Sequence, residues 1–332
     1  MAKPYYPQFA DTFQQALAGL KGKRVLIQGH LRPDGDCIGS QVALCRCLKQ
    51  IGAEAVVVQQ DTVPRNLESF IGDTPVCKVE QLSKLGWEDP LVINVDCAAA
   101  NRVGEALSER HPQLYANIDH HLSNPNYATH NIVHSESAAT CEILAGLFLD
   151  HDLPIDAVTA QALYVGIATD TGQFRFSSTT RQVFEICYRL LEHGADPAAA
   201  ALELYERESL ERVVLLQRFL ASLERVCDGR VCIGLLPDGI YAETGAQRED
   251  AEGFVDYTRA IDGVAIGVLL EENKGRIKGS LRAKDPSHRV DLIAGEFKGG
   301  GHAAAAGFNV DETLDTFYPK LLKALEQHFQ SL

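Results

Sequence analysis

The sequence has 332 residues, of which 45% are hydrophobic and 23% are charged, and its formal net charge is −14 at pH 7. This length suits two domains better than one core. The acidic balance argues against a broad surface for long DNA or RNA, which requires clustered Lys and Arg, but leaves room for a small anionic ligand. The start MAKPYYPQFADTF lacks a secretory signal, and no apolar run reaches membrane-spanning length. We therefore expect a cytoplasmic protein without membrane association, whose nine scattered cysteines stay reduced.

The first half of the chain alternates apolar, β-rich runs with segments of helical spacing. Strands or strand-like exits are predicted at 24–30, 53–60, 90–97, 114–121 and 162–172. Helices are predicted at 38–52, 137–151 and 179–194. This alternation predicts an α/β fold, with a mostly parallel sheet and helices on both faces. Ligands of such sheets bind beyond the carboxyl ends of the strands.

The second half has a different pattern. A helical stretch at 210–226 precedes strand-like runs at 229–237, 264–284 and 303–310, and an amphipathic helix is predicted at 314–332. The turn EENKGR predicts a hairpin, because Gly275 can adopt a positive φ. We therefore predict a first domain at 1–196, a helical linker at 197–227, and a smaller mixed-sheet α/β domain at 228–332.

Ionisable side chains gather where the strands of the first half are predicted to end. They are His30, Asp34, Asp36, Asp96, Asp119, His120, His121 and Asp170. Taken singly, each is more often a turn residue, a helix cap or a satisfied buried histidine. Taken together at one sheet edge, they would repel or titrate unless cations neutralise them.

The mixture of imidazole and carboxylate donors predicts the type of cation. It suits Mn²⁺, Co²⁺ or Zn²⁺ better than Mg²⁺ or Ca²⁺, which prefer oxygen. If six of these eight residues are ligands, they are too many for one tetrahedral ion and natural for two ions of higher coordination number. Paired divalent ions are the arrangement that supports in-line attack on phosphorus, so we predict a two-metal phosphoesterase ahead of a structural metal site.

Five ordered motifs carry a resemblance to a known family. HLRPDGDCIGS, VDCAAANR, DHH and TDTGQFRFSS resemble the four motifs of the DHH phosphoesterase superfamily, and FKGGGHAAAAG (297–307) resembles the GGGH motif of the DHHA1 domain. Length and architecture are most similar to the NrnA-type nanoRNase and pAp-phosphatase branch. Its members degrade very short oligoribonucleotides and remove the 3′-phosphate of 3′-phosphoadenosine 5′-phosphate (pAp). The resemblance implies an enzyme with two divalent cations, Mn²⁺ preferred, and short oligoribonucleotides or a nucleotide bisphosphate as substrate.

The resemblance also implies residue roles. A first ion would be bound by His30 and Asp34. A second ion would be bound by Asp36, His120 and Asp170, and both ions would be bridged by Asp96. Asp119 would orient a neighbouring imidazole by accepting a hydrogen bond. His121 would face the scissile phosphate, stabilising its charge or helping to protonate the leaving oxygen.

Substrate contacts are expected from both halves. Gly299, Gly300 and Gly301 would let the backbone approach a ligand, His302 would add a donor, and HAAAAG could start a helix whose N-terminus attracts anions. Arg282 matches the position of a phosphate-binding arginine in the family, and Arg102 could also reach substrate.

Several alternatives remain open at this point. The same site could serve a phosphodiesterase for cyclic dinucleotides or linear pApA. A RecJ-like exonuclease, a manganese pyrophosphatase and a catalytically inactive nucleotide sensor are less favoured. The sequence leaves open the physiological substrate, the metal, the cleavage polarity and the oligomeric state, a homodimer included.

Overall fold

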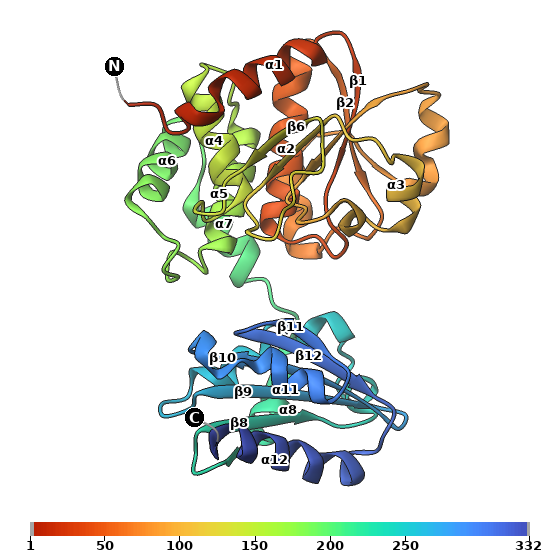
Figure 1. The fold of residues 1–332 in the computed structure, drawn as a ribbon, viewed down its shortest axis with the longest axis vertical. Coiled ribbons are helices and arrows are strands. Elements are labelled where there is room, and N and C mark those ends of the chain that lie inside the picture. Colours follow the sequence, from red (N-terminus) through yellow and green to blue (C-terminus); the bar gives the residue numbers. More distant parts are fainter. Residues whose placement is uncertain (1–2, 331–332) are drawn as a thin grey trace. The chain divides into compact units, whose positions relative to one another are not determined.

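A computed structural model describes residues 3–330 of the chain. Its internal contacts divide the chain into two compact units, of which the first ends at Arg207 and the second begins at Glu208 (Figure 1). The sequence-based boundaries, with a linker at 197–227, remain a prediction. Within residues 3–330, no helix has the length and apolar character needed to cross a membrane.

The first unit is built on a six-stranded sheet in which every neighbouring pair is parallel. In spatial order the strands are β3 (Val76–Lys78), β2 (Glu54–Gln59), β1 (Arg24–Gln28), β4 (Leu91–Val95), β5 (Ala116–Asp119) and β6 (His130–Val133). The central strands β1, β4 and β5 are buried at nearly every position, as expected for a parallel sheet covered by helices on both faces. The predicted α/β fold is therefore confirmed.

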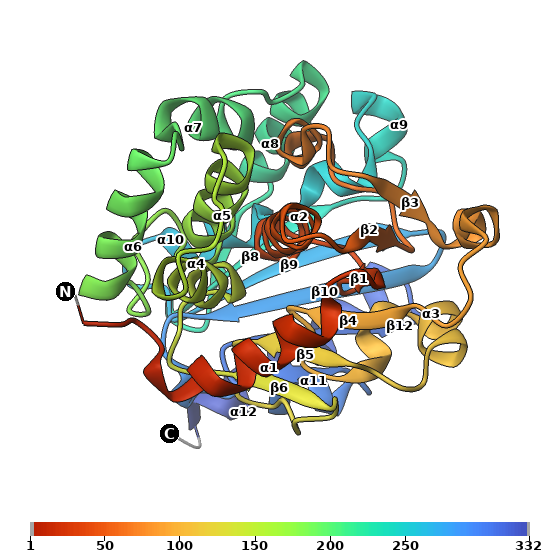
Figure 2. The ribbon, with the colours of Figure 1, turned by 90° about the horizontal axis from the view of Figure 1, so that it is seen from above.

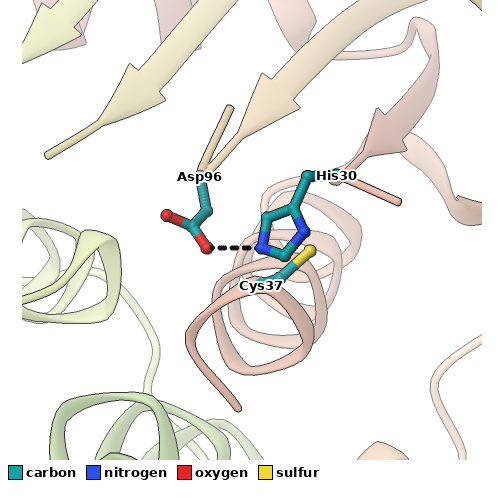
Figure 3. A group of neighbouring side chains, drawn as sticks. All are labelled: His30, Cys37 and Asp96. Atoms are coloured by element: carbon teal, nitrogen blue, oxygen red, sulfur yellow. Dashed lines mark ion pairs between the residues drawn. The ribbon is translucent and has the colours of Figure 1, made fainter. Parts of the chain in front are cut away.

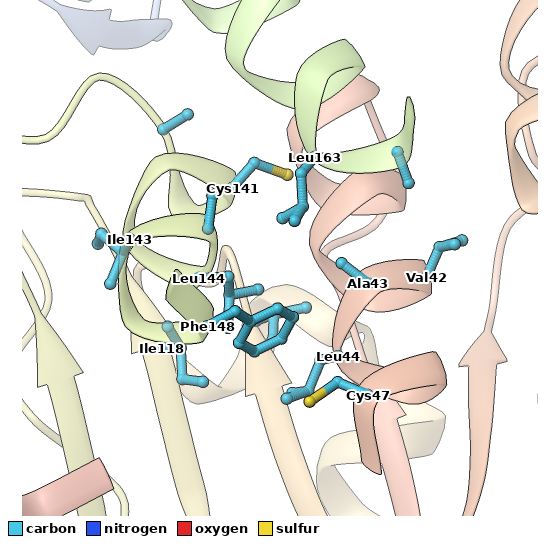
Figure 4. Close-up of a cluster of buried hydrophobic side chains, with 14 of the residues drawn as sticks. Val42, Ala43, Leu44, Cys47, Ile118, Cys141, Ile143, Leu144, Phe148 and Leu163 are labelled. Carbon is cyan, nitrogen blue, oxygen red and sulfur yellow. The ribbon is translucent and has the colours of Figure 1, made fainter. Parts of the chain in front are cut away.

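Helices cover both faces of this sheet (Figure 2). They are α1 (Ala10–Leu20), α2 (Gly35–Gln50), α3 (Glu105–Arg110), α4 (Thr140–Asp150), α5 (Ala157–Asp170), α6 (Arg181–Glu192) and α7 (Pro197–Tyr205). Side chains of α2, α4 and α5 meet in the main core, among them Leu44, Phe148 and Leu163 (Figure 4). A smaller cluster under α3 covers the other face. This packing holds the start of α2 and the end of α5 at the carboxyl edge of the sheet.

The prediction of a strand at 162–172 was wrong, because this segment forms most of α5. Residues of α5 are buried on nearly all sides, and a fully apolar run cannot reveal by its pattern whether it is a helix or a strand. Small residues allow α5 to lie close to α2: a Cβ on Gly39 would stand only 2.4 Å from the carbonyl oxygen of Ala162. Asp170 therefore lies at the end of a helix. Short strands β3 and β6 had not been predicted.

The second unit contains a mixed six-stranded sheet. In spatial order its strands are β11 (Gly300–His302), β12 (Ala305–Val310), β10 (Arg276–Ala283), β9 (Ile266–Asn273), β8 (Val231–Leu236) and β7 (Glu224–Val226). Only the β8–β9 pair is parallel. The predicted hairpin is confirmed between β9 and β10, where Lys274 and Gly275 have φ values of 49° and 76°.

Helices also flank the second sheet. They are α8 (Leu210–Ala221), α9 (Ile240–Thr244), α10 (Phe254–Ala260), α11 (Val290–Glu296) and α12 (Leu314–Gln330). Leu215 and Phe219 of α8 pack with α10 in one cluster, whereas α11 and α12 contribute to another. The final helix is confirmed up to Gln330, and the last two residues of its predicted span lie outside the described residues.

Candidate active site

Eight predicted residues come together at the carboxyl edge of the first sheet. His30 follows β1, Asp96 follows β4, and Asp119 ends β5 with two histidines directly after it. The remaining members come from the start of α2 and the end of α5: Asp34, Asp36 and Asp170. Parallel strands all end at the same edge of the sheet. The start of α2 and the end of α5 are packed at this edge too.

Asp96 lies between the histidines of this cluster. It has a φ of 55°, and its N–H donates to the carbonyl of Ile118 on the neighbouring strand at 3.0 Å, so its backbone is held in place. Its Oδ2 lies 3.3 Å from Nε2 of His30 (Figure 3). Its Oδ1 lies 3.5 Å from Nε2 of His120 and accepts a hydrogen bond from the hydroxyl of Thr140 at 3.3 Å. One carboxylate therefore presents its two oxygens to different imidazoles.

The PDGD segment places two further carboxylates through backbone hydrogen bonds. Asp34 caps α2, because its Oδ1 accepts a hydrogen bond from the N–H of Cys37 at 3.0 Å. Asp36 is fully buried and accepts hydrogen bonds from the N–H groups of Thr140 and Cys141, at 2.7 and 2.8 Å. Those two N–H groups open α4, where the helix dipole favours a negative charge.

His30 presents its Nε2 to two carboxylates. Its Nδ1 lies 2.8 Å from the carbonyl oxygen of Leu31, so this nitrogen carries the hydrogen and donates it to the backbone. Nε2 lies 3.6 Å from Oδ2 of Asp34 and 3.3 Å from Oδ2 of Asp96. A neutral imidazole would thus direct a lone pair at carboxylates, and only a proton or a metal cation relieves that repulsion.

His120 is placed in the same manner. Its Nδ1 lies 3.4 Å from the carbonyl oxygen of Ser137. Its Nε2 faces three carboxylates, at 3.4 Å from Asp170, 3.5 Å from Asp96 and 3.9 Å from Asp36. The ligand atoms of His120, Asp36 and Asp170 lie close enough together to hold one ion.

His121 is held by a different contact. Its Nδ1 donates to Oδ1 of Asp119 at 2.8 Å, and the other oxygen of Asp119 accepts a hydrogen bond from Asn124 at 2.6 Å. Burial raises the pKa of Asp119, but these hydrogen bonds outweigh it and lower the pKa overall. The hydrogen bond to Asp119 raises the pKa of His121. Among the described residues, its Nε2 has no hydrogen-bond partner, and the side chain is about one-third exposed.

The electrostatics of the cluster fit divalent cations. Burial, then the charge of Asp96, raises the pKa of Asp36 to about 7. Burial also raises the pKa of Asp96 and Asp170. Within residues 3–330, none of the five clustered aspartates forms an ion pair with Lys or Arg. Buried carboxylates without a fixed cation, facing imidazole lone pairs, are a donor set for metal ions such as Mn²⁺ or Zn²⁺.

Arg102 lies beside this cluster. The N–H of Leu31 donates to the carbonyl of Arg102 at 2.8 Å, which ties the residue after His30 to the segment after β4. An open hollow of about 290 Å³ is lined by Arg102 together with Leu31, Arg32, Asp61 and Asn101. The guanidinium groups of Arg32 and Arg102 form no hydrogen bond or ion pair with any described residue. An anionic group could therefore be held in this hollow.

The remaining predicted residues belong to the second unit, where Arg282 and His302 lie in one row. Arg282 on β10 pairs with Ala305 on β12, which in turn pairs with His302 on β11. Directly opposed residues of antiparallel strands point to the same face, and two strand spacings separate the outer pair by about 10 Å. Both side chains are at least partly exposed, so the row can contact a ligand.

The prediction that HAAAAG starts a helix was wrong, since it forms the β11–β12 hairpin. The glycines have a packing role here. A Cβ on Gly299 would stand 2.2 Å from the carbonyl oxygen of Gly307, and one on Gly301 (φ 149°) would stand 2.4 Å from that of Ala305. A Cβ on Gly300 would meet open space. The backbone is therefore close to its own neighbouring strand, and Gly300 and His302 face outward.

Comparison with known proteins identifies the family. Residues 24–167 match the DHH family, N-terminal domain, and residues 230–331 match the DHHA1 domain. The chain is 30% identical to "Bifunctional oligoribonuclease and PAP phosphatase NrnA" of Thermus thermophilus, over 98% of this chain and 96% of that protein. The chain belongs to the DHH family.

Two further relatives agree with this family. A protein of Bacillus subtilis with the same name, "Bifunctional oligoribonuclease and PAP phosphatase NrnA", is 24% identical to this chain. The match covers 86% of this chain and 89% of the Bacillus protein. A crystal structure of an exopolyphosphatase-related protein from Bacteroides fragilis superposes with a TM-score of 0.85 at 25% identity, covering 98% of this chain and 96% of that one.

Some residues of this DHH protein's site were missed by the sequence analysis. Asn124 supports Asp119, Arg32 lines the hollow with Arg102, and the thiol of Cys37 lies next to His30. Burial raises the pKa of this thiol to about 12. Only tertiary contacts reveal these neighbours, because nothing in their local pattern distinguishes them from ordinary turn or core residues.

Proposed function

We propose that this DHH protein is a metal-dependent phosphoesterase that hydrolyses short oligoribonucleotides to mononucleotides and removes the 3′-phosphate of pAp. The observation that carries the proposal is the position of Asp96, whose two oxygens face His30 and His120 separately. A carboxylate between two nitrogen donors is what a pair of ions requires as a bridge. The names of the NrnA relatives supply the substrate class.

The proposed ligands divide into two sets that share Asp96. His30 and Asp34 would hold the first divalent cation. Asp36, His120 and Asp170 would hold the second. We take Mn²⁺ as the preferred ion, because the donors combine imidazole nitrogen with carboxylate oxygen. Divalent cations bound there would supply Lewis-acid polarisation of the phosphoryl group and a water of lowered pKa.

The residues of the chain contribute positioning and proton control. Asp119 holds His121 with Nδ1 protonated, so that Nε2 is directed away from Asp119 and is free to meet the substrate. Because Asp119 raises the pKa of His121, the imidazolium is favoured, and it can stabilise the negative charge of the phosphoryl oxygens or donate a proton to the leaving oxygen.

The proposed substrate contacts lie in both units. Arg102, with Arg32 beside it, offers guanidinium groups that have no partner among the described residues. In the second unit, Arg282, His302 and the exposed backbone of Gly300 supply donors for a phosphate or a base. A few local cations in a chain of net charge −14 favour small anionic substrates over long nucleic acid.

The test is Mn²⁺-dependent hydrolysis by the full chain of four substrates: pAp, RNA two-mers, a long single strand and a cyclic dinucleotide. A chelator control should abolish every activity. Turnover of pAp and two-mers, but not of the long strand, is expected. Preference for the cyclic dinucleotide would indicate a signalling phosphodiesterase instead, and no turnover with ions bound would indicate a nucleotide sensor.

A further inference from the structure

The thiol of Cys37 is a buried donor that the proposed function does not use. Ligand atoms of Cys37, His30 and Asp96 all lie within 4.8 Å of one another. All three residues are at least nine-tenths buried, with exposed fractions of 0%, 7% and 2%. Figure 3 shows the sulfur beside the imidazole ring of His30. Sulfur, nitrogen and oxygen donors therefore converge at one edge of the candidate active site.

The position of the sulfur is set by its surroundings. The N–H of Cys37 donates to the cap residue Asp34 at 3.0 Å, which fixes the backbone at the start of α2. A Cβ on Gly29 would stand 2.3 Å from the sulfur, so only glycine leaves room for this thiol beside His30. The thiol donates a weak hydrogen bond to Oε1 of Gln41, at 3.9 Å.

Two other buried thiols near the cluster differ from Cys37. Cys97 follows Asp96 directly, and the thiol of Cys141 donates to the carbonyl of Asp36 at 3.5 Å. Among residues 3–330, neither belongs to a group of three donors close enough to hold an ion. The convergence is thus particular to Cys37 and does not follow from cysteine being common around the site.

We propose that His30, Cys37 and Asp96 form a binding site for a thiophilic divalent cation such as Zn²⁺ or Cd²⁺. With bond lengths of about 2.3 Å to sulfur and about 2.1 Å to nitrogen, a tetrahedral ion holds these donors about 3.6 Å apart. Donors that already lie within 4.8 Å of one another reach this spacing through side-chain shifts of about 1 Å. The thiol loses its proton to solvent as the sulfur–metal bond forms. A harder ion such as Mn²⁺ gains little from sulfur.

If the proposed function holds, a cation bound at this site should inhibit hydrolysis. Because His30 and Asp96 also belong to the ligand set proposed for the activating ions, a thiophilic cation held by Cys37 would displace one of them. Zn²⁺ or Cd²⁺ should therefore inhibit Mn²⁺-dependent hydrolysis. The binding claim itself does not depend on this consequence, because it can be measured without any substrate.

The experiment is a titration of the full chain with Cd²⁺, followed by the ultraviolet sulfur-to-cadmium charge-transfer band. We expect the band in the wild-type protein and in Cys47→Ala, which removes another buried thiol of α2. We expect its loss in Cys37→Ser, with Cd²⁺ affinity lowered by about tenfold or more. A band that persists in Cys37→Ser, or Cd²⁺ bound by the wild type without a band, would overturn the proposal.

A second measurement does not depend on the folding of the variant. The ¹¹³Cd resonance of the wild-type protein should lie in the range of sulfur-ligated cadmium, and a shift typical of only nitrogen and oxygen ligands would refute the site. In the hydrolysis assay, the inhibition constant for Zn²⁺ should rise by about tenfold in Cys37→Ser relative to Cys47→Ala. Absence of hydrolysis in the wild type would count against the proposed function alone, since the cadmium band would still report binding.

Discussion

The two sheets of the protein carry their candidate functional residues in different ways. In the first unit the residues stand at the ends of buried strands and helices, where backbone N–H groups hold the carboxylates, as for Asp36. In the second unit Arg282 and His302 project from the face of antiparallel strands and are at least partly exposed. A cluster that must place several charges within a few ångströms needs rigid, buried support. A substrate contact needs exposure more than rigidity.

The largest expected effect is a loss of turnover when a carboxylate of the buried cluster in the first unit is replaced. Asp96→Asn keeps a residue that tolerates the φ of 55° but removes the charge shared by both proposed ion sites. We expect turnover to fall by more than about 10³-fold. Steady-state kinetics with measured metal content provides the check. Asp152→Asn, an exposed aspartate with a φ of 48°, is the matched control. Near-normal turnover by Asp96→Asn with both ions bound would exclude the bridging role.

A smaller loss is expected from the contact that supports His121. Asp119→Ala removes the acceptor of the His121 Nδ1 hydrogen and leaves Asn124 without that partner. We expect kcat to fall by about 10- to 100-fold, with metal content unchanged. Asp119→Asn, which can still accept from His121, should lose less. Equal losses in both variants would point to a structural role for Asp119.

Replacing an exposed residue of the second unit should change KM. Arg282→Met should raise KM by about tenfold and leave kcat nearly unchanged, because it removes a charge-assisted hydrogen bond to substrate. Arg276→Met on the same strand is the control, since its ion pair with Asp311 is exposed. A fall in kcat with constant KM would instead place Arg282 in the chemical step.

Two neighbouring glycines test whether the GGGH segment is built for packing. Gly301→Ala puts a Cβ near the carbonyl oxygen of Ala305 at a φ of 149°, and should lower the free energy of unfolding by about 1–2 kcal/mol. Gly300→Ala meets open space and should unfold like the wild type. Urea denaturation measures both. Equal stability of the two variants would contradict the hairpin geometry.

The smallest effect concerns pH-dependent stability in the first unit. Partial burial raises the pKa of Asp156, but hydrogen bonds from Arg46 and from the N–H of Thr159 outweigh it and lower the pKa to about 2. A lowered carboxyl pKa stabilises the folded state above the unfolded value of 3.8, and this stabilisation is lost as the pH falls through about 2.

Asp156→Asn keeps the oxygen that caps α5, and it removes the charge together with the second oxygen that accepts from Arg46. Because the carboxylate is more than one-third exposed, we expect a loss of only about 1 kcal/mol at neutral pH. The difference between the two proteins should vanish near pH 2. Urea denaturation over this pH range measures it, and a constant difference would show that the charge is not the cause.

Much of the architecture follows from the sequence alone. The alternation of apolar runs and helical spacing predicts the parallel sheet, and the turn at Gly275 predicts the hairpin, because both signals are local. The residues that meet at the sheet edge, such as Asp96 and His120, are also predictable, since parallel strands must end on one side. The order of the motifs that contain these residues also predicts the family.

Only the tertiary structure decided the rest. Residues 162–170 form a helix that their pattern does not predict, because they are buried on nearly all sides and an apolar run then does not distinguish helix from strand. Ala303 and Ala304 form a turn, and Ala305 and Ala306 form a strand because β10 offers them a partner, so that pairing outweighs helix propensity. The placement of the Cys37 sulfur beside His30 depends on Gly29, directly after β1, meeting the first turn of α2. Such contacts arise from packing between segments, which no local pattern encodes.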